Sequence, residues 1–259
     1  MALETFDSAS VVGHPTGEAR WQARVDLAAL YRLFVHFGWT DLTYTHLSAR
    51  VPEGSDRYLV NPYGLLFDEI TASGLVEVDY AGRVWAGGPA YNRAGHFIHT
   101  AVLRARPEIN FVLHSHTRAA VALSTMRDGL LPLSQPAMVV RETVAYHAFS
   151  VAEENEDEAR RLVSDLGACH IMVLHNHGLL VCGRTAAEAF LYHYFMQTAC
   201  EIQTDALRAA YEYPDYVLPP PDASAKLAAW GRPRTKPWGD VQWVALMRLL
   251  DRTQPSFRQ

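Results

Sequence analysis

The 259-residue chain has very little lysine, since only two of its 23 basic residues are lysines, Lys226 and Lys236. Enzymes that form an imine with their substrate need a lysine in an apolar pocket, and no residue before 226 supplies one. Cysteine is also scarce, with three residues and no CxxC spacing. This scarcity disfavours a disulfide framework or a cysteine-based zinc site, and it is typical of a protein from a reducing compartment.

Long apolar runs and excess positive charge are absent as well. No run approaches the roughly 18 apolar residues that cross a bilayer, and the start, MALETFDSAS, lacks the basic region and apolar stretch of a signal peptide. The net charge is -5, which gives no general attraction for nucleic acid or anionic membranes. We therefore expect a cytoplasmic protein without nucleic-acid or membrane partners.

The chain contains enough apolar residues, 49%, for one large domain with a buried core. We find no internal repeat and no dividing linker, and strands alternate with helices, which predicts a single α/β domain. The expected division is a flexible arm over 1–17, a domain over 18–210 and a C-terminal extension over 211–259 at a subunit interface.

Hydrophobic spacing and turn residues predict the individual elements. Thr117 is the expected cap of one helix, and Thr185 with Glu188 forms a capping box at the start of another. The prolines of 211–240 predict an extended wrap. Helices are expected over 18–37, 93–104, 117–126, 153–166, 185–210 and 240–251, strands and hairpins over 42–79, and buried strands over 109–113, 171–174 and 179–182.

Two pairs of histidines follow buried strands. His114 and His116 stand two residues apart, so on a strand both side chains project to the same side. His175 and His177 repeat this pattern after the strand over 171–174. A divalent metal needs three or more ligands, which two such pairs can supply. The alternative is that each pair simply meets a solvated loop.

Other histidines are more ambiguous. His96 and His99 share one face of the helix over 93–104, where they can either line the same cavity or pack in the core. His147 lies in an apolar run and is expected to be a core histidine with its hydrogen bonds satisfied.

At this point the sequence resembles the class II aldolase/adducin family, in its adducin-like branch, over about residues 20–210. HSH followed about 60 residues later by NHG is the specific part of the match. The matching segments, in order, are GWTDLTYTHLSARVP (38–52), VNPYGLLFDEITASGLVEVD (60–79), ARPEINFVLHSHTRAAVALS (105–124), GLLPLSQPA (129–137) and VLHNHGLLVCGRTAAEAF (173–190).

The resemblance implies a three-layer α/β/α fold around a central mixed, mostly antiparallel sheet. It also implies a homotetramer with active sites at subunit interfaces. By position, it assigns a divalent metal ion to His114, His116 and His177, with zinc first and manganese, iron or cobalt as alternatives. In the family this metal binds substrate oxygens and stabilises the negative charge left when a carbon–carbon bond breaks.

The sequence departs from the sugar-phosphate aldolases of the family at several positions. Their general-base glutamate falls on Gly95, and no carboxylate lies between Asp79 and Glu108. Their phosphate-binding GNxS segment reads THLS here, over 45–48, and Tyr63 replaces a serine. An arginine common at position 175 is histidine, which leaves open whether His175 joins the metal site. These changes argue against a sugar-phosphate substrate.

We therefore expect a metal-dependent carbon–carbon lyase acting on a non-phosphorylated hydroxy- or oxo-carboxylic acid. A decarboxylase is favoured over an aldolase because loss of carbon dioxide needs no base to break the bond. The expected catalytic residues are Arg93, His99 and Tyr211, and the expected substrate-binding residues are His46, Ser48, Tyr63, Arg118 and Arg141. The arginines can instead form surface or interface ion pairs, and Tyr211 can simply pack at an interface.

Two other functions remain open from the sequence. An Fe(II)-dependent oxygenase of an aromatic 2-oxo acid would use the same three histidines with open coordination positions. A non-catalytic scaffold, as in the adducins, would keep the fold without the chemistry, although it would have no need of three converging imidazoles.

Overall fold

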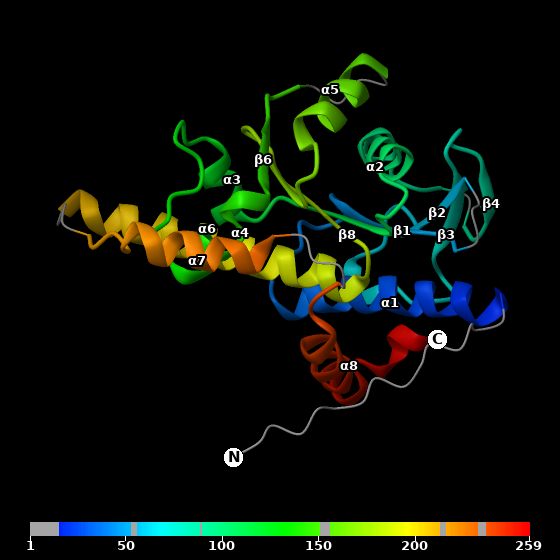
Figure 1. Cartoon of the computed structure of the whole chain (residues 1–259). Coiled ribbons are helices and arrows are strands. Elements are labelled where there is room, and N and C mark those ends of the chain that lie inside the picture. The colour runs from blue at the N-terminus through cyan, green and yellow to red at the C-terminus, as the bar shows by residue number, and fades with distance from the viewer. Residues whose placement is uncertain (1–15, 53–55, 89, 151–155, 213–215, 233–236) are drawn as a thin grey trace.

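The computed structural model of the chain describes residues 16–52, 56–88, 90–150, 156–212, 216–232 and 237–259 (Figure 1). Most of the expected arm over 1–17 lies outside these residues, and Thr16 already begins the first helix, α1 (Thr16–His36). Within the described residues, no helix is long and apolar enough to cross a membrane.

The described strands form one eight-stranded sheet in the order β4-β3-β2-β1-β5-β8-β7-β6. Neighbouring strands are antiparallel except β6 and β7, which are parallel. This confirms the expected mixed, mostly antiparallel sheet. The strands are β1 (His46–Arg50), β2 (Arg57–Val60), β3 (Val76–Asp79), β4 (Val84–Ala86), β5 (Phe111–Ser115), β6 (Val144–His147), β7 (Ile171–Leu174) and β8 (Gly178–Gly183).

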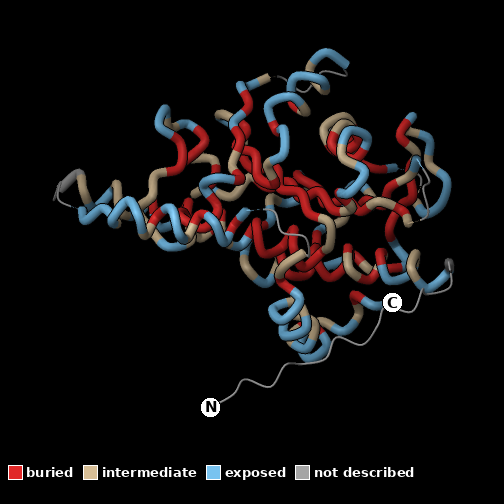
Figure 2. Tube along the Cα trace, in the orientation of Figure 1, coloured by how far each residue is buried: buried red, intermediate tan, exposed pale blue. Residues whose placement is uncertain are grey.

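Helices cover both faces of the sheet, which confirms the three-layer α/β/α architecture (Figure 1). One face carries α2 (Ala94–Ala105) and α5 (Glu156–Leu166). Figure 2 shows the buried residues concentrated in the sheet and in the helices against it. The opposite face carries α1, α3 (Arg118–Ser124), α4 (Gln135–Val140) and α6 (Ala186–Glu212). Outside this layer, α7 (Pro221–Gly231) packs against α4, and α8 (Asp240–Thr253) packs against α1 and α6.

Alternation along β5 determines which way the histidines point. Phe111 and Leu113 pack in the core beside α1 and α6, whereas Val112 packs in the core beside α2 and α5. Because side chains alternate along a strand, His114 shares the α2 side with Val112. His46 of β1 pairs directly with His114, so it faces the same layer.

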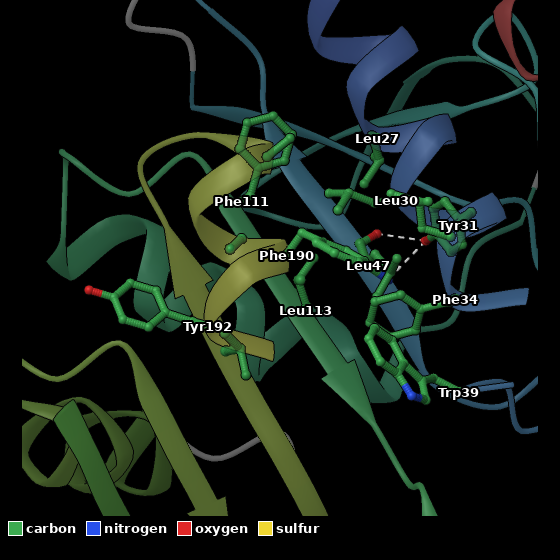
Figure 3. Close-up of a cluster of buried hydrophobic side chains, with 14 of the residues drawn as sticks. Leu27, Leu30, Tyr31, Phe34, Trp39, Leu47, Phe111, Leu113, Phe190 and Tyr192 are labelled. Atoms are coloured by element: carbon green, nitrogen blue, oxygen red, sulfur yellow. Dashed lines mark hydrogen bonds between the residues drawn. The ribbon is translucent and has the colours of Figure 1, made fainter. Parts of the chain in front are cut away.

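The α1 side of the sheet fixes β1 in place. The hydroxyl of Tyr31 donates to the Leu47 carbonyl at 2.6 Å and accepts from the Leu47 amide at 2.9 Å. Figure 3 shows this pair within a cluster of buried side chains from α1, β1, β5 and α6. The burial of Tyr31 and Leu47 anchors the residue next to His46.

Several local expectations need correction. Residues 221–231 form helix α7 rather than an extended wrap, because Pro221 stands at a helix start and the alanine-rich residues after it favour helix. Thr117 occupies the cap position of α3, but its hydroxyl bonds to Gln197 of α6 instead of the helix backbone. Thr185 caps α6, whereas the Glu188 carboxylate bonds to Arg184.

Candidate metal centre

Three histidines converge where β5 ends and β8 begins. His114 is in β5, His116 follows it, and His177 directly precedes β8. One nitrogen from each ring lies within 4.8 Å of the other two, and the Nε2 atoms of His114 and His116 are 2.9 Å apart. Nitrogens that share a metal at about 2.1 Å are at most about 4.2 Å apart, so small ring rotations suffice.

Hydrogen bonds fix the tautomers of two of these rings. His114 Nδ1 is 2.8 Å from the Leu179 carbonyl, and His116 Nδ1 is 3.0 Å from a carboxylate oxygen of Asp41. Both partners only accept hydrogen bonds, so each Nδ1 carries the proton. The Nε2 atoms, on the opposite side of each ring, are the atoms that face each other in the cluster. Three imidazole nitrogens directed toward one point are a donor set that fits a divalent metal ion.

The local backbone explains how His177 reaches the site. Asn176 adopts a left-handed conformation with φ of 57°, which asparagine tolerates better than most residues. The turn delivers Gly178 against β5, where an added Cβ would lie 2.3 Å from the Ser115 carbonyl oxygen. Only glycine permits this close approach of the two strands.

The same turn sends His175 elsewhere. Its Nδ1 lies 2.9 Å from the Ser124 carbonyl of α3, and its ring stacks against Tyr146. His175 is not among the clustered ligands, so the expectation of two same-side histidines in HNHG is wrong. The reason is that residues 175–177 form a turn, where the two-residue alternation of a strand does not apply.

Two further imidazoles lie beside the cluster on the α2 side. The rings of His46 and His99 are 4.0 Å apart, and the His46 ring is 5.8 Å from that of His114. His99 Nδ1 bonds to the Ser48 hydroxyl at 2.6 Å. Among the described residues, both ring nitrogens of His46 and Nε2 of His99 are buried without a hydrogen-bond partner. Such nitrogens are available to a polar ligand or to water.

His46 occupies the space that a side chain at position 95 would need. A Cβ on Gly95 would lie 1.5 Å from His46 Cε1 and 1.7 Å from its Nε2. The absence of a side chain at Gly95 and the presence of an imidazole at His46 are therefore two halves of one packing arrangement.

Burial favours the neutral form of four histidines at the site, His46, His99, His114 and His177. It lowers the pKa of His46 and of His177 to about 4, and it lowers the pKa values of His99 and His114 well below the usual range. Neighbouring histidines act in the same direction. Unprotonated imidazoles are the form that binds metal, so at neutral pH these rings are ready to act as ligands.

The other residues expected at the site are spread around it. Arg118 begins α3 and lines a cavity of about 820 Å³ together with His116. Arg93 is exposed before α2, and Tyr63 is 59% exposed. Arg141 donates to the Ser224 hydroxyl of α7. Tyr211 lies in the last turn of α6, and its side chain is outside the described part of the structure.

The carboxylate of Asp41 is the site residue that sequence reasoning missed. It lies 75 residues before His116, and no motif spacing links the two. The core histidine interpretation of His147 is confirmed, because its ring bonds to both Asp165 and Glu158.

Comparison with known proteins identifies the family. The model of the class II aldolase and adducin N-terminal domain matches residues 25–204. The chain belongs to the class II aldolase/adducin family. A Pseudomonas aeruginosa protein named "Putative aldolase class 2 protein" is 44% identical, with 93% of each chain covered.

Two other relatives show the range of this family. Alpha-adducin of Rattus norvegicus is 38% identical over 88% of this chain, which spans 33% of that protein's length. The solved structure of L-fuculose 1-phosphate aldolase from Glaciozyma antarctica is 26% identical with a TM-score of 0.84, covering 96% of this chain and 97% of that one. Membership of the class II aldolase superfamily is consistent with a metal-dependent lyase.

Proposed function

We propose that the protein is a metal-dependent carbon–carbon lyase acting on a non-phosphorylated hydroxy- or oxo-carboxylic acid, and a decarboxylase rather than an aldolase. The facing Nε2 atoms of His114 and His116, 2.9 Å apart with His177 beside them, carry the proposal. Bound there, a divalent ion supplies Lewis-acid stabilisation of negative charge on a substrate oxygen. Three imidazoles suit zinc first, and manganese, iron or cobalt are compatible.

The surroundings of His46 support decarboxylation. Aldol cleavage needs a base close to the substrate, and the space beside residue 95 holds an imidazole whose pKa is lowered to about 4 by burial. A neutral imidazole of this kind can hydrogen-bond a substrate oxygen. In decarboxylation the carbon–carboxylate bond breaks without a base, and the chain's task is to orient the acid and return a proton to carbon.

We propose further roles for Arg118, His99 and Tyr211. Arg118 shares a cavity with His116, and its guanidinium can hold a carboxylate through two parallel hydrogen bonds. His99, fully buried between Ser48 and His46, positions the His46 ring. Tyr211 remains our candidate for the proton donor, supplied by a neighbouring subunit of a homotetramer.

The metal site is tested by two variants in the same turn. His177→Ala removes a proposed ligand, and His175→Ala removes the neighbouring histidine that bonds to Ser124 instead. We expect protein purified without chelator to contain one metal ion per chain, by elemental analysis, and only His177→Ala to lose it. Full metal content in His177→Ala would contradict the proposed ligand set.

The reaction is tested on a panel of 2-oxo and hydroxy acids, aromatic acids included. We expect release of carbon dioxide from at least one acid by the metal-loaded protein, and loss of that release in His114→Ala. Full turnover by His114→Ala would refute the mechanism. The same assay with an oxygen electrode tests the Fe(II) oxygenase, because that reaction stops without oxygen and decarboxylation by a lyase does not.

A non-catalytic scaffold is the second candidate, and its support is the 38% identity to alpha-adducin. If the purified protein holds no metal and cannot be loaded with any divalent ion, this function replaces the lyase.

A further inference from the structure

The carboxylate of Asp41 contacts His116 of the histidine cluster on the side of the ring that faces away from His114. Its Oδ2 is 3.0 Å from Nδ1 of His116, the ring nitrogen opposite the one that faces His114. We infer that Asp41 is a positioning residue that holds His116 ready for a metal ion. This inference rests on the metal site in the proposed function.

The contact controls both the tautomer and the direction of the His116 ring. A carboxylate accepts the Nδ1 proton, so the lone pair must be on Nε2, where the metal would bind. The negative charge also makes the imidazole a stronger ligand. In many metal sites a carboxylate beyond the ligand has this function.

His116 depends on such a partner more than His114 does. His114 lies within β5, and its Nδ1 bonds to the backbone carbonyl of Leu179 in the paired strand β8. His116 lies past the end of β5, and its side chain is 25% exposed. A strand therefore orients His114, whereas among the described residues the side chain of Asp41 makes the hydrogen bond to His116 Nδ1.

The segment that carries Asp41 has an unusual backbone. Asp41 and Tyr44 form an isolated bridge, and the Tyr44 amide donates to the Asp41 carbonyl at 2.8 Å. Leu42 and Thr45 have φ of 49° and 66°. Left-handed backbone is unfavourable for both, and especially for the β-branched threonine. Asn176, beside His177, is the other described non-glycine residue with positive φ.

Burial of the turn's own side chains does not account for this conformation. Leu42 is 70% exposed and Tyr44 is 59% exposed. The ends are anchored, since Trp39 and Thr45 are buried, and Thr45 leads directly into His46. The strained turn between these anchors brings the Asp41 carboxylate to His116.

The inference is tested by metal affinity rather than turnover. Zinc affinity is measured by competition with a chelator of known affinity, for wild type, Asp41→Ala, Asp41→Asn and Asp205→Asn. Asp205 lines the same cavity and pairs with Arg208 at 3.7 Å, so it serves as the charge-matched control. We expect Asp41→Ala to weaken zinc binding by roughly 10–100-fold.

The conservative variant separates the hydrogen bond from the charge. An asparagine oxygen can still accept the Nδ1 proton, so Asp41→Asn should recover most of the affinity that Asp41→Ala loses. Asp205→Asn should bind zinc as wild type does. In the metal-free proteins, ring ¹⁵N chemical shifts should report a protonated Nδ1 for His116 in wild type and a mixed tautomer in Asp41→Ala.

The possible failures are distinguishable. If wild type binds no zinc or other divalent ion, the proposed metal site fails and the role of Asp41 with it. If wild type binds zinc and folded Asp41→Ala binds it equally well, only the role of Asp41 is overturned. Equal weakening in Asp41→Asn and Asp205→Asn also overturns it, since the effect would then be one of charge alone.

Discussion

His46 packs into the space beside Gly95. The effect of Gly95→Ala on stability should therefore depend on whether the His46 ring is present. Gly95 is the second residue of α2, and its φ is not in the left-handed region, so alanine should improve helix formation by up to about 1 kcal/mol. The added Cβ would lie 1.5 Å from His46 Cε1, so the imidazole must move. Overpacking of this kind costs about 1–3 kcal/mol.

We therefore expect Gly95→Ala to destabilise the wild-type chain by about 1–2 kcal/mol, and to be neutral or stabilising in a His46→Ala background. The coupling energy between the two positions should be about 1–3 kcal/mol. Urea unfolding followed by circular dichroism, with chelator present, measures the packing term without any contribution from metal.

Gly17 provides a matched control. It is the second residue of α1, and an added Cβ there meets no atom within 4 Å. Gly17→Ala should thus report the helix preference alone. The reasoning is refuted if Gly95→Ala has the same effect, within about 0.5 kcal/mol, in the presence and absence of the His46 ring.

Two further predictions concern Gly178, the first residue of β8, and His193, a buried histidine of α6. Gly178→Ala should destabilise the chain by about 1–3 kcal/mol and lower its metal content, because the new Cβ would lie 2.3 Å from the Ser115 carbonyl oxygen. Wild-type metal content in the purified variant would contradict this. Burial lowers the pKa of His193 to about 3. As the pH falls below 6.5, the unfolded chain therefore binds a proton at this histidine that the folded chain does not bind, and stability falls. Between pH 7.5 and 5 this lowers the free energy of unfolding by about 2 kcal/mol. His193→Gln should abolish this contribution, measured by urea titration. An unchanged pH slope in the variant would count against the prediction.

Much of the sheet could be predicted because its strands are short apolar runs with clear turn residues between them. The same alternation predicted that His114 and His116 project to the same side, and both rings belong to the histidine cluster. Residues 221–231 were harder, because prolines suggested an extended chain. A proline at the first helical position favours a helix, and tertiary contacts such as the hydrogen bond from Tyr192 to the Gly231 carbonyl show where that helix packs.

Residue spacing alone predicts the candidate site only where the backbone stays regular, and His177, which lies in a turn, was assigned by the family resemblance. Strand alternation applies to His114, but it fails for His175, because Asn176 turns the backbone into the left-handed region and sends that ring to α3. The relation between His46 and Gly95 joins residues 49 positions apart, and that between Asp41 and His116 joins residues 75 apart. No periodicity encodes such contacts. The first depends on a helix start that packs against the beginning of β1, and the second on a strained turn that packs against the end of the neighbouring strand β5. The residues that tune a metal ligand are therefore less visible in a single sequence than the ligands themselves.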